Sequence, residues 1–241
     1  MRIKATSNLI AAVMVILIAL TMMAVLLTTH YQQQRLQVQA DLLHAQQMLV
    51  LFRKGSDNLS YALRAFAATG EEKFRSEYQA ELEVTQSRER ALKGLSQLKL
   101  QSNEQQLINE SKLLSDTAVQ LEQNIFRQQP LQAVTAAYGS QYSNAKRAVN
   151  SRLNTLGSDM QLRLEQQIDY FSRLTLRTEQ LLFGLLILDG ALILLVFIGF
   201  VRLQLVKPLL RLTRQTQRLA AGEMTAQFGY QQDQSELGEL A

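Results

Sequence analysis

Two long apolar segments, separated by a polar region, constrain the fold of this chain more than any other feature of its sequence. Leu9–Leu27 has no charged residue, and as a helix it would extend roughly 28 Å, close to the ~30 Å hydrocarbon core of a bilayer. Leu181–Val201 is slightly longer and contains one acidic residue, Asp189. The sequence therefore predicts two membrane-spanning helices. The predicted organisation is an N-terminal segment at 1–8, spans at 9–29 and 181–201, a domain at 30–180 and a C-terminal segment at 202–241.

Basic residues flank both spans and predict the orientation of the chain in the membrane. Arg2 and Lys4 precede the first span, whose apolar length exceeds the usual ~7–15 residues of a signal peptide, so we expect an uncleaved anchor. The basic residues after the second span are Arg202, Lys207, Arg211, Arg214 and Arg218. Because cytoplasmic flanks carry the excess of Lys and Arg, both termini are predicted to be cytoplasmic. The domain at 30–180 is then exported from the cytoplasm.

The composition excludes several classes of function. Cysteine is absent, so a disulfide framework and a thiolate metal site are both ruled out. His30 and His44, the two histidines, are too far apart to share a metal ion. The sequence shows no phosphate-binding loop, no nucleophile elbow and no pair of carboxylates in an arrangement that indicates catalysis. We therefore expect no cofactor, no metal, no nucleic-acid partner and no catalytic site within these residues.

The region between the spans has the pattern of four amphipathic helices. Apolar residues recur at steps of three and four, as in the seam formed by Leu107, Ser111, Leu114, Ala118, Leu121 and Ile125. Thr69-Gly70 predicts the end of the first helix, a capping box at Ser102 and Gln105 the start of the third, and Pro130 the start of the fourth. The predicted fold is all-α: an antiparallel up-down-up-down four-helix bundle flanked by two transmembrane helices, followed by the start of a coiled coil.

The residues after the second span predict a short helix that needs partners. Leu209, Leu212, Thr216 and Leu219 form a seam too short to be stable alone, which implies at least a homodimer. Together with Pro208, Gly222-Glu223-Met224 and Asp233–Leu240, this segment resembles a HAMP domain, the signal-relay bundle that two subunits of a receptor form. The resemblance covers only part of such a domain, so we expect 202–241 to be truncated. The alternative is a basic amphipathic helix lying on lipid.

A second resemblance lies in the domain between the spans. Ser56-Asp57-Asn58-Leu59, Arg64, Thr69-Gly70, Phe74 and Tyr78, with Tyr138-Gly139, Tyr142 and Lys146, are similar to the periplasmic four-helix sensor domains of methyl-accepting chemotaxis proteins and of some sensor kinases and diguanylate cyclases. The resemblance implies a chemoreceptor of a bacterial inner membrane, with residues 30–180 in the periplasm. It also implies that the receptor contacts a coupling protein and a kinase through an output domain. The alternatives are a sensor histidine kinase or diguanylate cyclase with the same input module, and a non-sensory membrane-anchored coiled coil.

Candidate site residues follow from charge and spacing. Asp57 and Arg64 are two helical turns apart and share a face, where Arg64 could bind a carboxylate ligand in a bidentate manner. Tyr78, Tyr142 and Lys146 could add hydrogen bonds to a small ligand such as an amino acid or an organic acid, unless a periplasmic binding protein is sensed instead. The alternative is that Arg64 forms a structural ion pair or is solvated and that the tyrosines belong to the core.

A second set of candidates concerns signal relay. Placing the Asp189 carboxyl group in the interior of a bilayer costs free energy. It either sets helix rotation through a polar contact, with Thr21 as a possible partner, or is satisfied locally. The other predicted relay residues are Pro208, Gly222, Glu223 and Glu236.

Overall fold

The computed structural model describes residues 2–200, 202, 206, 207, 210 and 213, and this part of the chain is helical without strands. Its long elements are α1 (Arg2–Thr69) and α6 (Ser140–Phe200). The chain divides into two compact units, one formed by Leu27–Arg177 and the other by Met1–Leu26 with Thr178–Ala241. The all-α prediction is confirmed.

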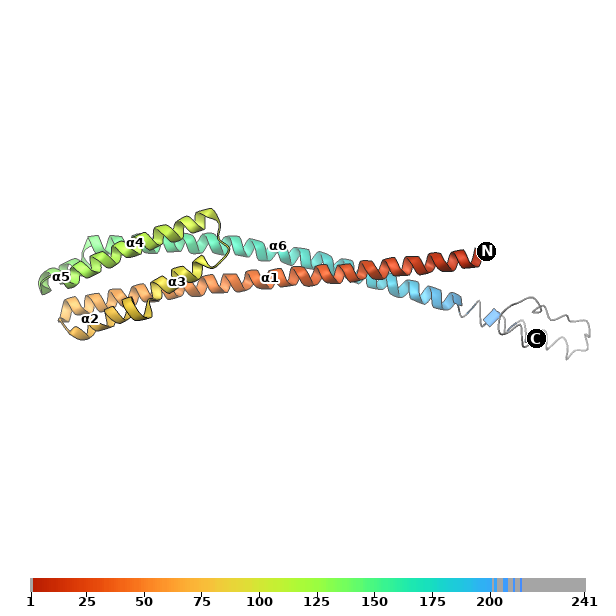
Figure 1. The fold of residues 1–241 in the computed structure, drawn as a ribbon, viewed down its shortest axis with the longest axis horizontal. Coiled ribbons are helices and arrows are strands. Elements are labelled where there is room, and N and C mark those ends of the chain that lie inside the picture. The colour runs from red at the N-terminus through yellow and green to blue at the C-terminus, as the bar shows by residue number, and fades with distance from the viewer. Residues whose placement is uncertain (1, 201, 203–205, 208–209, 211–212, 214–241) are drawn as a thin grey trace, which may run out of the picture. The chain divides into compact units, whose positions relative to one another are not determined.

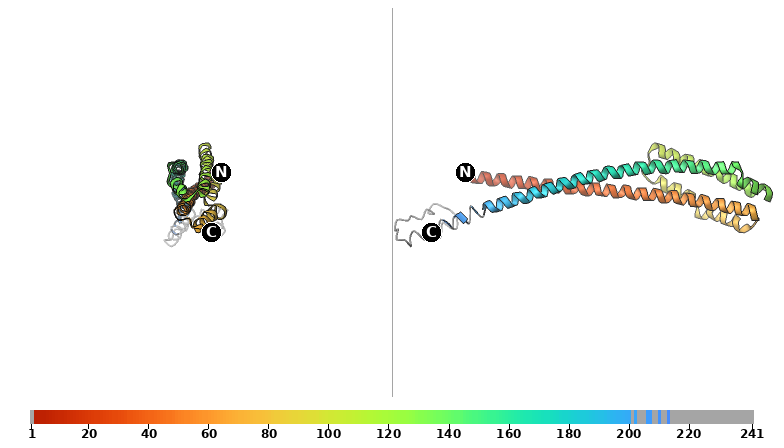
Figure 2. Two further views of the ribbon diagram at one scale, coloured as in Figure 1. Left: turned by 90° about the vertical axis from the view of Figure 1, so that its left-hand side faces the viewer. Right: turned by 180° about the vertical axis from the view of Figure 1, so that it is seen from behind.

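The unit Leu27–Arg177 is the predicted four-helix bundle (Figure 1). Between α1 and α6 the chain forms a helical hairpin whose members run alongside the two long helices, as the view from behind also shows (Figure 2). The elements of the hairpin are α2 (Glu72–Gln79), the π-helical segment η1 (Ala80–Thr85), α3 (Ser87–Ser96), α4 (Ser102–Phe126) and α5 (Pro130–Tyr138). The predicted bundle is therefore present, with two breaks that the sequence patterns did not reveal.

The first break interrupts the second helix of the bundle. The chain leaves α2 through η1 and turns at Gln86, which has a left-handed φ of 49°. Gln86 donates its backbone N–H to the Glu81 carbonyl oxygen at 2.8 Å, and α3 then starts afresh. A left-handed non-glycine residue is uncommon and costs free energy, so the surrounding contacts must hold this turn in place. The second break lies at Gly139, whose extended backbone separates α5 from α6.

The predicted helix ends are mostly correct. Gly70 has φ of 71° and closes α1 by donating its N–H to the Phe66 carbonyl at 2.8 Å. Pro130 is the first residue of α5. The capping box of α4 was placed one residue too late. Gln101 is the N-cap and Glu104 is its partner, because the Glu104 carboxylate accepts the Gln101 backbone N–H at 2.8 Å.

The core of the bundle consists of apolar residues from all four helices. Phe52, Leu95, Leu153 and Leu156 are almost completely buried in it. A second cluster near the α5 end includes Leu63, Ala137 and Tyr142. At roughly 1.5–3 kcal/mol for each large apolar side chain removed from water, this burial is the main favourable contribution to the stability of the bundle.

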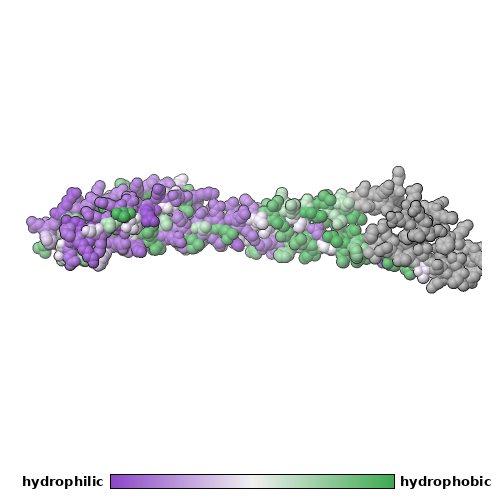
Figure 3. All heavy atoms as spheres, turned by 60° about the horizontal axis from the view of Figure 1, so that its bottom comes forward, coloured by the Kyte–Doolittle hydropathy of each residue, from purple (hydrophilic) through white to green (hydrophobic). Residues whose placement is uncertain are grey.

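The other unit contains the apolar ends of α1 and α6. Each of the two helices includes an 18-residue stretch that is apolar and long enough to cross a membrane, and almost none of it is buried within the protein. Large apolar side chains such as Met22, Ile187 and Leu195 are mostly exposed, and Figure 3 shows apolar residues gathered over these segments. An exposed apolar surface of this length suits a lipid environment.

Candidate functional site

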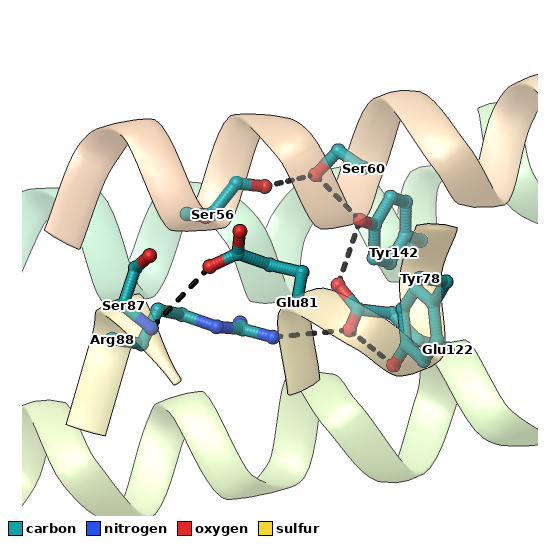
Figure 4. Close-up of polar contacts among 8 residues, drawn as sticks. All are labelled: Ser56, Ser60, Tyr78, Glu81, Ser87, Arg88, Glu122 and Tyr142. Carbon is teal, nitrogen blue, oxygen red and sulfur yellow. Dashed lines mark hydrogen bonds and ion pairs between the residues drawn. The ribbon is translucent and has the colours of Figure 1, made fainter. Parts of the chain in front are cut away.

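A buried carboxylate, that of Glu122 in α4, forms the centre of a polar cluster inside the bundle (Figure 4). The Tyr78 hydroxyl donates to its Oε2 at 2.8 Å, and the Tyr142 hydroxyl donates to its Oε1 at 2.9 Å. The Arg88 guanidinium donates from Nη2 to Oε2 at 3.2 Å and neutralises the charge. We call these residues, together with Ser60, the polar centre.

The members of the polar centre come from every helix of the bundle. Tyr78 lies in α2, Arg88 in α3, Glu122 in α4 and Tyr142 in α6, and Ser60 of α1 lies 2.8 Å from the Tyr142 hydroxyl. Since the Tyr142 proton is donated to Glu122, Ser60 must be the donor in that contact or turn its proton to the Ser56 carbonyl at 2.8 Å. Hydrogen bonds to one carboxylate thus join α2, α3, α4 and α6, and Ser60 places α1 beside them through Tyr142.

A second buried carboxylate explains the break in the second helix. Glu81 accepts the Ser87 backbone N–H through Oε1 and the Asn58 side-chain N–H through Oε2, each at 3.3 Å. Glu81 therefore occupies the position of an N-terminal cap for α3, where a negative charge is favoured. Gly55 of α1 allows this arrangement, because a Cβ atom there would lie only 2.5 Å from the Ser87 Cβ.

Burial is the main cause that raises the pKa of the Tyr78 and Tyr142 hydroxyls far above their usual range, and the neighbouring Glu122 charge raises it further. Both tyrosines therefore remain hydrogen-bond donors at neutral pH, as the Glu122 carboxylate requires.

The raised tyrosine pKa values predict alkaline instability. Below pH ~10 both hydroxyls are protonated in the folded and unfolded chains; above it only the unfolded chain loses these protons. We expect the free energy of unfolding to fall by up to ~1.4 kcal/mol per pH unit for each tyrosine above pH ~10. Urea unfolding between pH 9 and 11 measures this slope, and Tyr142→Phe should reduce it. A slope unchanged in that variant would contradict the assignment to Tyr142.

The residues predicted to bind a ligand fall into separate groups. Asp57 forms an ion pair with Lys146 at 3.0 Å, with its carboxylate largely exposed. Arg64 donates through Nε to the Ala137 carbonyl at 3.3 Å, and its guanidinium lies 5.0 Å from the centre of the Tyr138 ring. Tyr78 and Tyr142 do meet, but on the buried Glu122 rather than at the surface. The role of these five residues in ligand binding stays a prediction.

The sequence reasoning missed Glu122, Arg88 and Ser60. The buried seam of α4 consists of Glu104, Ile108, Ser111, Ser115, Ala118, Glu122 and Ile125, which also alternate steps of four and three. The predicted seam shares three of these positions, but Leu107, Leu114 and Leu121 are only half-buried. The prediction followed the leucines and therefore chose Leu107, Leu114 and Leu121 in place of the more deeply buried Ile108, Ser115 and Glu122. Two glutamates at seam positions were the signal that could have indicated buried ion pairs, since Glu104 in turn binds Arg163 at 2.7 Å.

Asp189 and Thr21 meet in the unit that holds the apolar segments. The Thr21 hydroxyl lies 2.8 Å from Asp189 Oδ2 and 2.9 Å from the Leu17 carbonyl oxygen. It has a single proton, so it donates a hydrogen bond to one of these two oxygens at a time. A polar contact therefore joins α1 and α6 at this level. The remaining predicted relay residues, Pro208, Gly222, Glu223 and Glu236, lie outside the described residues.

Comparison with known proteins identifies one domain. Residues 200–241 match the family model of the HAMP domain. No curated protein and no solved structure matches the chain. The HAMP match follows the second of two helices that could cross a membrane. Together these findings support a HAMP-containing transmembrane signal transducer and are consistent with a location in the inner membrane.

Proposed function

We propose that this chain is the sensing and relaying part of a methyl-accepting chemotaxis protein. Residues 30–180 face the periplasm, both termini lie in the cytoplasm, and a small molecule or a periplasmic binding protein is the input. One observation carries the proposal. α6 holds Tyr142 of the polar centre near its start and continues without a break to Phe200, where the HAMP match begins.

The polar centre supplies a mechanism for this relay. Tyr142 of α6 is bound through Glu122 to α4, so a change in the hydrogen bonds of Glu122 shifts α6 against its neighbours. A continuous helix transmits such a shift along its length. Tightly packed helices respond by moving between discrete arrangements, because a packed interface deforms poorly. The HAMP domain then changes its packing and passes the signal to a coupling protein and a kinase through an output domain.

The full-length receptor provides the test of this function. We expect mass spectrometry of the protein from cells to find methylated glutamates, and affinity purification to recover a chemotaxis coupling protein and kinase. Synthesis of a cyclic dinucleotide or a phosphorylated histidine in the receptor itself would instead show a receptor enzyme and overturn the proposal.

The receptor we propose is a homodimer that pairs through α1. Leu36, Leu43 and Val50 follow one another at steps of seven, and each is about 60% exposed. The buried Ala45 and Phe52 lie two positions beyond Leu43 and Val50, about 200° further around the helix. An apolar heptad stripe on the side opposite the core suits the same stripe of a second copy, and HAMP bundles require two subunits.

The absence of cysteine makes the dimer straightforward to test. We expect Leu43→Cys to form a disulfide-linked dimer in membranes under mild oxidation, because the stripe would place the two thiols face to face. Leu113→Cys is the matched control, since Leu113 is somewhat more exposed than Leu43, at 69% against 60%, but lies on α4. Cross-linking of equal extent at both positions would indicate random collision and contradict the proposed interface.

A further inference from the structure

A groove between α3 and α4 combines the features of a ligand site. It has a volume of about 420 Å³, within the range of roughly 300–1,000 Å³ typical of small-molecule sites. Helix α1 packs against α3 at Gly55, and α6 binds α4 through the ion pair of Arg163 with Glu104. The α3–α4 groove is therefore on the side of the bundle away from α1, and an α1-mediated dimer leaves it open.

The lining of the groove is apolar at its floor and charged at its rim. Leu92 and Ile108 are buried at the floor. The rim carries acidic Glu89 and Asp116 and basic Lys93 and Lys112, and in the described part of the chain none of these four has an ion-pair partner. Charged side chains of both signs, without ion-pair partners among the described residues, thus flank one apolar floor.

Two buried polar groups also reach the groove. Ser115 is 6% exposed and lines it, and its hydroxyl has no hydrogen-bond partner among the described residues. Arg88 is also buried and lines the groove, while only its Nη2 is engaged, by Glu122. Its remaining N–H groups are donors without an acceptor in the described residues. Among the described residues, the buried side-chain nitrogen and oxygen atoms without a hydrogen-bond partner are Arg35 Nε and Ser111 Oγ, so the Ser115 hydroxyl and these Arg88 N–H groups are open to the groove. A ligand oxygen in the groove can accept from them.

We propose that this groove binds an aliphatic α-amino acid, an inference that rests on the proposed receptor function. The carboxylate would bind Arg88 and Lys112, the ammonium group Asp116 and Glu89, and the side chain Leu92 and Ile108. The two acidic residues would repel a simple anion, and the basic residues would repel a simple cation. A zwitterion with an apolar side chain satisfies both signs and the floor.

Arg88 connects this groove to the polar centre. Its guanidinium holds Glu122, which in turn holds Tyr142 of α6. A carboxylate ligand that draws Arg88 toward the groove weakens its bond to Glu122. Binding on the α3–α4 side thereby reaches the helix that leads to the HAMP domain.

The test uses the whole chain in nanodiscs and isothermal titration calorimetry with L-leucine, L-valine and L-alanine as probes. We expect at least one to bind. For that probe, the analogue without its ammonium group and the analogue without its carboxylate should each bind about tenfold more weakly, as loss of a charged hydrogen bond implies. For L-leucine these analogues are 4-methylpentanoate and 3-methylbutylamine. Equal affinity of either analogue, or no binding of any probe, overturns the inference.

Variants locate the site. Asp116→Asn and Lys112→Met should each weaken binding about tenfold. Asp169→Asn, a charge change on an exposed position of α6, should leave affinity unchanged. Asn109→Trp, which fills the groove from its exposed rim, should abolish binding while the helical circular dichroism stays intact.

Arg64→Ala separates this site from the one predicted near Asp57. It should leave the affinity unchanged. A loss of binding in Arg64→Ala without a loss in the groove variants overturns the groove assignment. A receptor that is methylated and recovers a coupling protein, yet binds none of the probes, keeps the proposed function and loses only this inference.

Discussion

Replacement of Arg88 by Met should lower the free energy of unfolding by about 3–5 kcal/mol, because it leaves the buried charge of Glu122 without a counter-ion. Glu122 is 2% exposed, so water cannot compensate for the loss. The two tyrosine donors remain, but they carry no positive charge. Urea unfolding of the chain in nanodiscs, followed by circular dichroism, measures the change.

Two further variants make this result specific to the buried charge. Lys146→Met removes the partner of Asp57 in an ion pair whose carboxylate is largely exposed, and should cost less than ~1 kcal/mol. Adding Glu122→Gln to Arg88→Met should recover part of the lost stability, because the amide oxygen still accepts a hydrogen bond while the buried charge is gone. Equal losses in Arg88→Met and Lys146→Met would contradict the role assigned to the polar centre.

Substitution of Gly55 by Ala should destabilise the bundle by about 1–3 kcal/mol, the usual cost of overpacking a core. The new Cβ atom would lie 2.5 Å from the Ser87 Cβ and 3.3 Å from the Arg88 backbone nitrogen. These atoms sit at the start of α3, so no side-chain rotation can relieve the clash. The break between η1 and α3 would have to move away from α1.

Gly190→Ala is the matched control for this prediction. Gly190 is also helical, but a Cβ atom there would meet no atom within 4 Å, so alanine should be neutral or stabilising through its higher helix propensity. Thermal unfolding of both variants gives the comparison. An unchanged midpoint in Gly55→Ala would show that the contact between α1 and α3 is looser than the structure indicates.

Much of the fold was predictable because it depends on pattern alone. Apolar length predicts the two candidate spans, and Gly70 and Pro130 predict helix boundaries through backbone conformation. The breaks at Gln86 and Gly139 were not predictable in this way. Gln86 adopts its left-handed turn because Glu81 caps α3 and because Gly55 on a different helix leaves room, and these are tertiary contacts.

The candidate site was only partly predictable. Tyr78 and Tyr142 were identified from the sequence, but their common partner Glu122 was not, because a glutamate in a helix of a soluble domain is ordinarily exposed. Arg88 and Glu122 are separated by 34 residues, and no local spacing relates them. Sequence periodicity assigns residues to faces of helices, whereas the choice of partners across the bundle depends on how the helices are rotated against one another.

The two possible seams of α4 have a consequence for that rotation. The leucines at 107, 114 and 121 stand one residue before Ile108, Ser115 and Glu122, and both seams share Ser111, Ala118 and Ile125. A turn of the helix by roughly 50°, half the angle between successive residues, would therefore exchange a seam that contains two carboxylates for one rich in leucine. Hydrophobic burial alone therefore does not determine how α4 is rotated about its own axis. Arg88 and Arg163 select it by holding Glu122 and Glu104 inward. Because both pairs are shielded from solvent, added salt should leave this choice largely unaffected.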